Sequence, residues 1–224
     1  MKWRKTQIDS IKQFGSFVGV HLRDFGDFII PGQIIYLFQK EFDDHIRPSV
    51  FIKREDNLIW FSVNEKQEWK IGDWVYFRGP IGNGFQPMSF YEKLLFIIPG
   101  ELIGSLIPLI DEAILRNKNI SIACNNVVSQ FKPESEIISF DDLEFAIDWA
   151  DYIYLECKYE DFPNFEWIIN NIKKCGVPSE IFFQTAILCG GTADCMVCAV
   201  KTRRGFQQVC KTGPVLLISE MEIN

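Results

Sequence analysis

Four of the seven cysteines lie close together near the end of the chain, with the spacing C-x5-C-x2-C-x11-C. The first gap is one residue longer than in the C-x4-C-x2-C…C pattern that holds plant-type [2Fe-2S] clusters. Four thiolates that converge on one small volume can ligate two iron ions, and Gly190 and Gly191 allow the tight backbone turn that such a loop needs. The spacing therefore predicts a [2Fe-2S] cluster ligated by Cys189, Cys195, Cys198 and Cys210.

A structural zinc ion is the alternative for these cysteines, because zinc also accepts four thiolate ligands and a C-x2-C pair. The second C-x2-C pair that is typical of such zinc sites is missing here. The sequence thus favours iron and sulfide over zinc.

The overall composition is that of a compact, acidic protein, with 224 residues, 47% of them hydrophobic, and a formal net charge of −7. An acidic balance disfavours nucleic acid as a partner, since phosphate recognition depends on clustered Lys and Arg. No apolar segment follows the basic start of the chain, and residues 94–110 are interrupted by Pro99, Glu101 and Pro108. We therefore expect a cytoplasmic protein that does not enter a membrane.

The elements that must position the cysteines fall into three stretches. Residues 1–90 contain short β-like runs separated by turn residues, which predicts an antiparallel sheet or barrel. Strands alternate with helical patterns over residues 91–176, among them a predicted helix at 102–116, and this alternation indicates a parallel α/β layer. Residues 177–224 return to β character around the cysteines.

Several short motifs, in their order along the chain, resemble the electron-transfer subunit of class 1B dihydroorotate dehydrogenase, a ferredoxin-reductase-like flavoprotein. The motifs are Pro31-Gly32-Gln33, Arg47-Pro48-Ser49, Gly72-Asp73, Gly79-Pro80-Ile81-Gly82-Asn83-Gly84-Phe85 and Cys210-Lys211-Thr212-Gly213-Pro214-Val215. The resemblance implies an FAD-binding antiparallel β-barrel at 1–90, a Rossmann-like nucleotide-binding α/β domain at 91–176 and a small [2Fe-2S] domain at 177–224. It also implies a partner, the FMN-containing catalytic subunit, in a heterotetramer that serves pyrimidine biosynthesis.

For FAD, the family motif Arg-Pro-x-Ser resembles Arg47, Pro48, Ser49 and Val50, with valine in place of the final serine. Arg47 supplies the fixed positive charge that a pyrophosphate needs. The resemblance adds Ser62 and Val63 on the next strand, although the family's Gly-x-Gly-Thr loop after that strand is absent.

The nicotinamide motifs of the family are replaced. Its glycine-rich turn corresponds to residues 98–105, where Pro99 removes an amide donor and Glu101 repels phosphate. Its Cys-Gly-Pro turn corresponds to Cys157-Lys158-Tyr159. We therefore expect an auxiliary subunit without catalytic residues, which passes electrons from FMN through [2Fe-2S] and FAD to an acceptor other than NAD. The alternatives are an electron-transfer subunit for another flavoprotein, and a non-catalytic, zinc-stabilised subunit that binds a partner.

Overall fold

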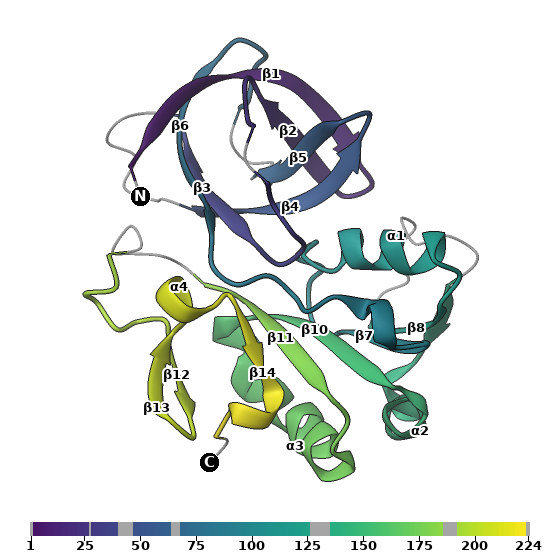
Figure 1. Cartoon of the computed structure of the whole chain (residues 1–224). Coiled ribbons are helices and arrows are strands. Elements are labelled where there is room, and N and C mark those ends of the chain that lie inside the picture. The colour runs from purple at the N-terminus through teal and green to yellow at the C-terminus, as the bar shows by residue number, and fades with distance from the viewer. Residues whose placement is uncertain are drawn as a thin grey trace.

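The computed structural model describes residues 2–26, 28–39, 47–63, 68–125, 135–185 and 192–222. Figure 1 shows a barrel at the top and an α/β layer below it, with the C-terminal segment beside the sheet. The chain passes from the barrel into the α/β layer once, after strand β6 (Trp74–Ile81).

The barrel is a closed ring of antiparallel strands in the order β1-β2-β5-β4-β3-β6. The other strands are β1 (Arg4–Phe14), β2 (Phe17–Leu22), β3 (Ile34–Phe38), β4 (Arg47–Glu55) and β5 (Leu58–Val63). Alternate side chains point inward, because successive residues of a strand face opposite sides. Their interior cluster includes Ile8, Val20, Leu22, Ile35, Phe51, Phe61, Val75 and Phe77. The predicted antiparallel barrel is confirmed.

The α/β layer has one sheet in the order β14-β11-β10-β7-β8-β9, in which only β14 runs antiparallel to its neighbour. Its strands are β7 (Lys93–Ile98), β8 (Asn119–Cys124), β9 (Glu136–Ile138), β10 (Tyr152–Lys158), β11 (Ser179–Gln184) and β14 (Val215–Leu217). The predicted parallel α/β layer is confirmed. β11 and β14 come from the predicted C-terminal domain, yet they are strands of this sheet.

The rest of the C-terminal segment contributes a hairpin of β12 (Ala199–Thr202) and β13 (Gly205–Gln208), followed by the short helix α4 (Val209–Thr212). This hairpin is a separate two-stranded sheet. A [2Fe-2S] domain at 177–224 stays a prediction.

In the described part of the chain, three helices cover the sheet: α1 (Ile107–Leu115) on the side of the barrel, and α2 (Leu143–Trp149) and α3 (Glu166–Cys175) on the opposite side (Figure 1). The prediction that the first helix begins at residue 102 is wrong, because the amides of Ile103, Gly104 and Leu106 donate to a side chain of β10 instead of forming a helical turn. The 3-10 helices are η1 (Met88–Phe90), η2 (Phe140–Asp142), η3 (Tyr159–Phe165) and η4 (Ile218–Glu220).

The core of the α/β layer continues into the outer wall of the barrel. Tyr36 and Val50 are both fully buried and belong to the same apolar cluster as Leu106 of the segment before α1. The two bodies are therefore packed together through apolar side chains. Among the described residues, no helix is long and apolar enough to cross a membrane.

Candidate functional site

Three of the sequence motifs meet where the barrel, the sheet and the C-terminal segment join. The Asn83 amide N–H donates to Gly213 O at 3.1 Å, and its side-chain amide donates to Thr212 O at 2.9 Å. From the barrel, Gln33 Nε2 donates to Gly82 O at 3.0 Å. A Cβ atom on Gly82 would lie 2.1 Å from Gly213 O, and its φ of +84° is in the left-handed region. This contact requires glycine.

The predicted FAD residues on β4 and β5 divide between the two faces of the barrel wall. Ser49 pairs with Ile35 of the barrel interior, and Val63 packs against the same interior cluster. Val50 and Ser62 lie on the outer face, where the Val50 N–H donates to Ser62 Oγ at 3.2 Å. Among the predicted FAD residues whose side chains are described, these two and Pro48 lie on the outer face.

Arg47 begins β4 and pairs with Leu37, and its side chain lies outside the described residues. The outer wall near Arg47 combines the half-buried Pro48, the apolar Val50 and the hydroxyl group of Ser62. Such a wall has the chemistry of a flavin contact, which is mostly apolar with a few hydrogen-bonding groups.

Farther along β4, the barrel contacts the α/β layer directly. Lys53 Nζ lies 2.6 Å from Asp111 Oδ2 of α1, and both side chains are partly buried. A Cβ atom on Gly104 would lie 3.1 Å from Ile52 Cγ2 and from Phe17 Cζ. Any flavin at this wall is therefore restricted to the part of β4 before Ile52.

In open α/β sheets, ligands usually bind beside the carboxyl ends of the strands where the strand order reverses, which here is the position between β7 and β10. We call this position the crevice, after its counterpart in such sheets. Glu156, near the end of β10, is 1% exposed and points into the turn that precedes α1. Its Oε1 accepts from the amides of Ile103 at 2.8 Å and Gly104 at 3.3 Å. Its Oε2 accepts from Ser105 Oγ at 2.7 Å and from the amide of Leu106 at 3.2 Å.

Burial raises the pKa of the Glu156 carboxyl group, and the four hydrogen bonds oppose that rise because they favour the ionised form. Each carboxyl oxygen accepts two hydrogen bonds, which is the full capacity of a carboxylate. We call the side chain and the four donors that it receives the Glu156 cradle.

A second set of contacts covers the mouth of this crevice. Lys158, at the end of β10, forms an ion pair and hydrogen bond with Glu101. Atoms of Phe165 and Asp161 in η3 lie 3.8 Å and 3.9 Å from the position of a Cβ atom on Gly100. The segment that replaces the family's nicotinamide turn therefore lies directly against the turn after β7.

The cysteine segment brings two of the four predicted ligands together. Cys198 and Cys210 are buried, and the Cys210 amide N–H donates to Cys198 Sγ at 3.5 Å. Cys195 is exposed, and Cys189 lies outside the described residues. Within the described ranges, no group of three His, Cys, Asp or Glu side chains is arranged to hold a metal ion.

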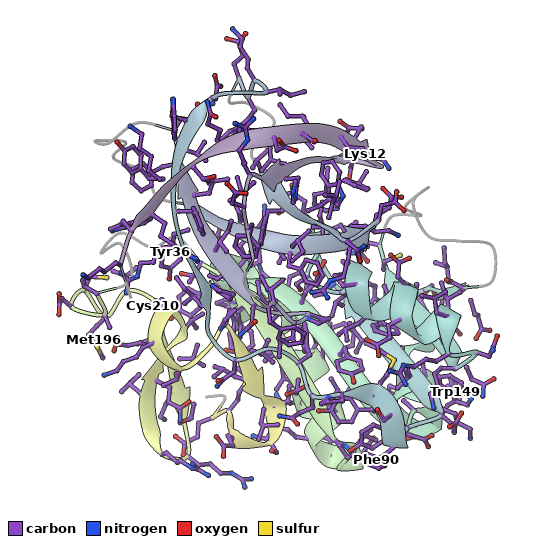
Figure 2. The ribbon with its side chains drawn as sticks, turned by 45° about the horizontal axis from the view of Figure 1, so that its top comes forward. Lys12, Tyr36, Phe90, Trp149, Met196 and Cys210 are labelled. Carbon is purple, nitrogen blue, oxygen red and sulfur yellow. The ribbon has the colours of Figure 1, made fainter. Side chains whose placement is uncertain are left out.

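The donor chemistry of this segment fits a thiophilic metal centre, because an amide N–H that donates to a sulfur atom is a feature of thiolate ligands. Ala193 and Met196 on either side of Cys195 have φ values of 68° and 56°, so the described part of the loop takes left-handed backbone conformations at residues other than glycine. Figure 2 shows Met196 at the outer edge of the segment and Cys210 nearer to the barrel.

Tyr159 connects the crevice to the cysteine segment. Its hydroxyl donates to Ala199 O at 2.7 Å, one residue after Cys198, and its ring packs edge-on against Phe183. Sequence reasoning missed this role and that of Glu156. The available signal was a glutamate within the otherwise apolar run of β10, since an unpartnered carboxylate is costly to bury.

Comparison with known proteins agrees with this architecture. No protein-family profile matches the chain. A solved structure of an NADH-dependent reduced ferredoxin-NADP oxidoreductase superposes with a TM-score of 0.70 at 18% identity, over 97% of this chain and 89% of the other. The fold is that of the ferredoxin reductases. The ferredoxin reductase in carbazole 1,9a-dioxygenase is also similar, with a TM-score of 0.58 and 16% identity over 82% of this chain and 68% of the other.

Two curated relatives carry the name dihydroorotate dehydrogenase B (NAD(+)), electron transfer subunit. The one from Clostridium acetobutylicum is 27% identical over 89% of each chain. The one from Clostridium perfringens is 24% identical over 71% of each. The resemblance stated from the sequence motifs is confirmed.

Proposed function

We propose that this chain is the electron-transfer subunit of a dihydroorotate dehydrogenase-type complex. It would take electrons from the FMN of a catalytic subunit, carry them through a [2Fe-2S] centre and FAD, and deliver them to an acceptor other than NAD. The electron-transfer role is supported by the names of the two curated relatives and by a fold that matches ferredoxin reductases over nearly the whole chain. The relatives' names include NAD(+), so the different acceptor is argued from this chain's own residues, Pro99, Glu101 and Cys157-Lys158-Tyr159.

One observation carries the proposal: the place where Gln33, Gly82, Asn83 and Gly213 meet, which we call the motif junction, adjoins the buried thiols of Cys198 and Cys210. Thr212, whose carbonyl oxygen accepts from the side-chain amide of Asn83, is two residues after Cys210. The backbone N–H of Cys210 in turn donates to Cys198 Sγ. Gln33, which bonds Gly82 at this junction, precedes Ile34, and Ile34 pairs with Val50. We propose that the flavin binds on this side of the barrel wall, so that a cofactor held at the thiols lies near it. Short separation between redox groups is what an electron relay needs from its protein.

The protein residues have simple roles in this proposal. Cys189, Cys195, Cys198 and Cys210 would hold the cluster. Arg47 would neutralise the pyrophosphate, while the half-buried Pro48 and Ser62 would contact the flavin and the buried Val50 would pack beneath them. The cofactors supply the redox chemistry when bound, and the protein supplies position, burial and electrostatics. The remaining predicted FAD residues, Ser49 and Val63, would support this wall from inside the barrel.

The partner would be an FMN-containing dihydroorotate dehydrogenase catalytic subunit, in a heterotetramer. This assignment rests on the relatives' names. The exposed apolar side chains near the cysteines, Met196, Val197 and Phe206, offer contact area for such a subunit.

A cofactor assay on the protein purified anaerobically from its own host tests the proposal. We expect about two iron and two sulfide ions per chain, bound flavin, and visible absorbance that dihydroorotate bleaches only when the catalytic subunit is present. One zinc ion per chain with no flavin would overturn the relay and support a zinc-stabilised, partner-binding subunit. If the iron and flavin are reduced by a different flavoprotein dehydrogenase with its own substrate, the electron relay stands but the proposed partner is wrong.

A further inference from the structure

The crevice between β7 and β10 is the topological switch point of the sheet. From β7 the chain continues to β8 on one side, whereas β10 pairs with β7 on the other side. In open α/β sheets this is where ligands bind, and the amides of the turn after the first strand commonly receive a phosphate group. The turn after β7 would be that phosphate-binding turn here.

The amides of this turn already have a partner. Gly104 has a φ of +98°, and with Ile103 and Leu106 it directs three backbone N–H groups toward one point. Backbone N–H groups that converge in this way form an anion-binding concavity. Glu156 places its carboxyl group in that concavity and Ser105 adds a fourth donor, so no described donor of the cradle is left for a ligand.

The mouth of the crevice carries mostly acidic side chains. Glu101, Glu160 and Asp161 surround a single lysine, Lys158, which is paired with Glu101. Phe165 and Asp161 also lie against Gly100, at the start of the turn that would receive the phosphate group. A diphosphate would therefore meet a covered entrance and like charge before it reached the cradle.

We propose that Glu156 is the built-in ligand of the turn after β7, and that it is the specificity-determining residue that prevents this subunit from accepting a nicotinamide dinucleotide. The choice of acceptor rests on the proposed function, whereas the occupancy of the cradle is independent of it. The α/β layer then serves as a rigid support, through which Tyr159 holds the segment that carries Cys198.

Chemical rescue of Glu156→Ala tests the proposal. Acetate has the carboxylate and the carbon atom that this truncation removes, so it should enter the vacated cradle and receive the same four hydrogen bonds. We expect the variant to unfold at a lower temperature than wild type. Acetate at about ten times its dissociation constant should raise the Tm by roughly 3 °C above a sodium chloride sample of equal ionic strength. Inorganic phosphate should also stabilise the variant.

Glu180→Ala is the matched control, because Glu180 is another buried carboxyl of the sheet but accepts only one backbone amide, from Gln86. Both wild type and Glu180→Ala should respond to acetate as they do to chloride. A Glu156→Ala protein that shows no specific response to acetate or phosphate would overturn the proposal. Measurable binding of NADH by the wild-type protein would overturn it as well.

Hydrogen exchange on the wild-type protein covers the case in which Glu156→Ala does not fold. The amides of Ile103, Gly104 and Leu106 should exchange as slowly as those of β7, since all three donate to a buried acceptor. Rapid exchange at these amides would contradict the cradle. If the cofactor assay finds no cluster or flavin while acetate stabilises Glu156→Ala, the electron relay is wrong and the role of Glu156 stands. If the cofactors are present but acetate has no specific effect, the relay stands and the role of Glu156 is wrong.

Discussion

The crevice between β7 and β10 and the cysteine segment are neighbours joined by Tyr159, yet their polar groups are used in opposite ways. In the crevice, the carboxyl group of Glu156 accepts a hydrogen bond from each of the four donors of the cradle. In the cysteine segment, two buried thiols are adjacent and a third, that of Cys195, is exposed. A site that must bind a ligand leaves ligating groups for it, whereas a structural site uses them internally. The chemistry of this chain is therefore expected at its thiols.

The strongest test of that contrast removes a thiol. We expect Cys198→Ser to lose nearly all bound iron and sulfide, because a serine hydroxyl does not replace a thiolate in a cluster. The measurement is iron and sulfide per chain, together with the visible spectrum. Cys175→Ser is the control, since Cys175 is exposed and bonds Asp148 outside this segment. Equal iron in the two variants would contradict the ligand assignment.

The next largest effect is expected in the crevice. Glu156→Ala leaves three amides and a hydroxyl without their acceptor, so the free energy of unfolding should fall by about 3 kcal/mol. Urea denaturation monitored by circular dichroism measures this loss. Iron content should stay at the wild-type level, because the cradle holds no predicted ligand. A stability loss below about 1 kcal/mol would show that the cradle is not a tightly satisfied network.

Glu180 sharpens the comparison because it is a second buried carboxyl with fewer donors. Burial raises its pKa, so the fold favours the protonated form. The stability that this form contributes is complete below the unfolded-state pKa of about 4.3 and is lost as the pH rises through the folded-state pKa. The Glu180→Gln variant has no carboxyl group at this position and does not lose this stability. Its free energy of unfolding should therefore increase relative to that of wild type as the pH rises.

The measurement for Glu180 is the difference in free energy of unfolding between Glu180→Gln and wild type at about pH 4 and about pH 8. This difference should be smaller in size than the loss in Glu156→Ala, since glutamine still accepts the amide of Gln86. A difference that is constant with pH would mean that Glu180 has the same pKa in the folded and unfolded states.

The smallest effect is expected at the mouth of the crevice. The Glu101 side chain of the pair with Lys158 is 74% exposed. Lys158→Met should therefore change the free energy of unfolding by less than about 1 kcal/mol, and it should not create binding of NADH. A large loss of stability, or new NADH binding, would indicate that the surface pair and not Glu156 closes the crevice.

Much of the fold could be predicted because its patterns are local. Short runs separated by turn residues gave the barrel strands, and strand–helix alternation gave the α/β layer. Gly176 at the end of α3 has the left-handed φ of 73° that suits its position as a helix terminator. The start of α1 was predicted wrongly because the apolar spacing continues through residues 102–106, while Glu156 on a different strand accepts from the amides of Ile103, Gly104 and Leu106.

The sequence by itself determined the types of chemistry available: four closely spaced thiols, glycines at the motif junction and a turn that lacks the family's glycines. These depend on residue identity and short spacing. Only the tertiary structure decided which of the groups meet. It placed Val50 and Ser62 on the outer wall and Ser49 and Val63 on the inner side, and it directed Glu156 into the cradle. The physical reason is that strand register and the packing of distant segments fix these contacts, and neither is encoded in local spacing.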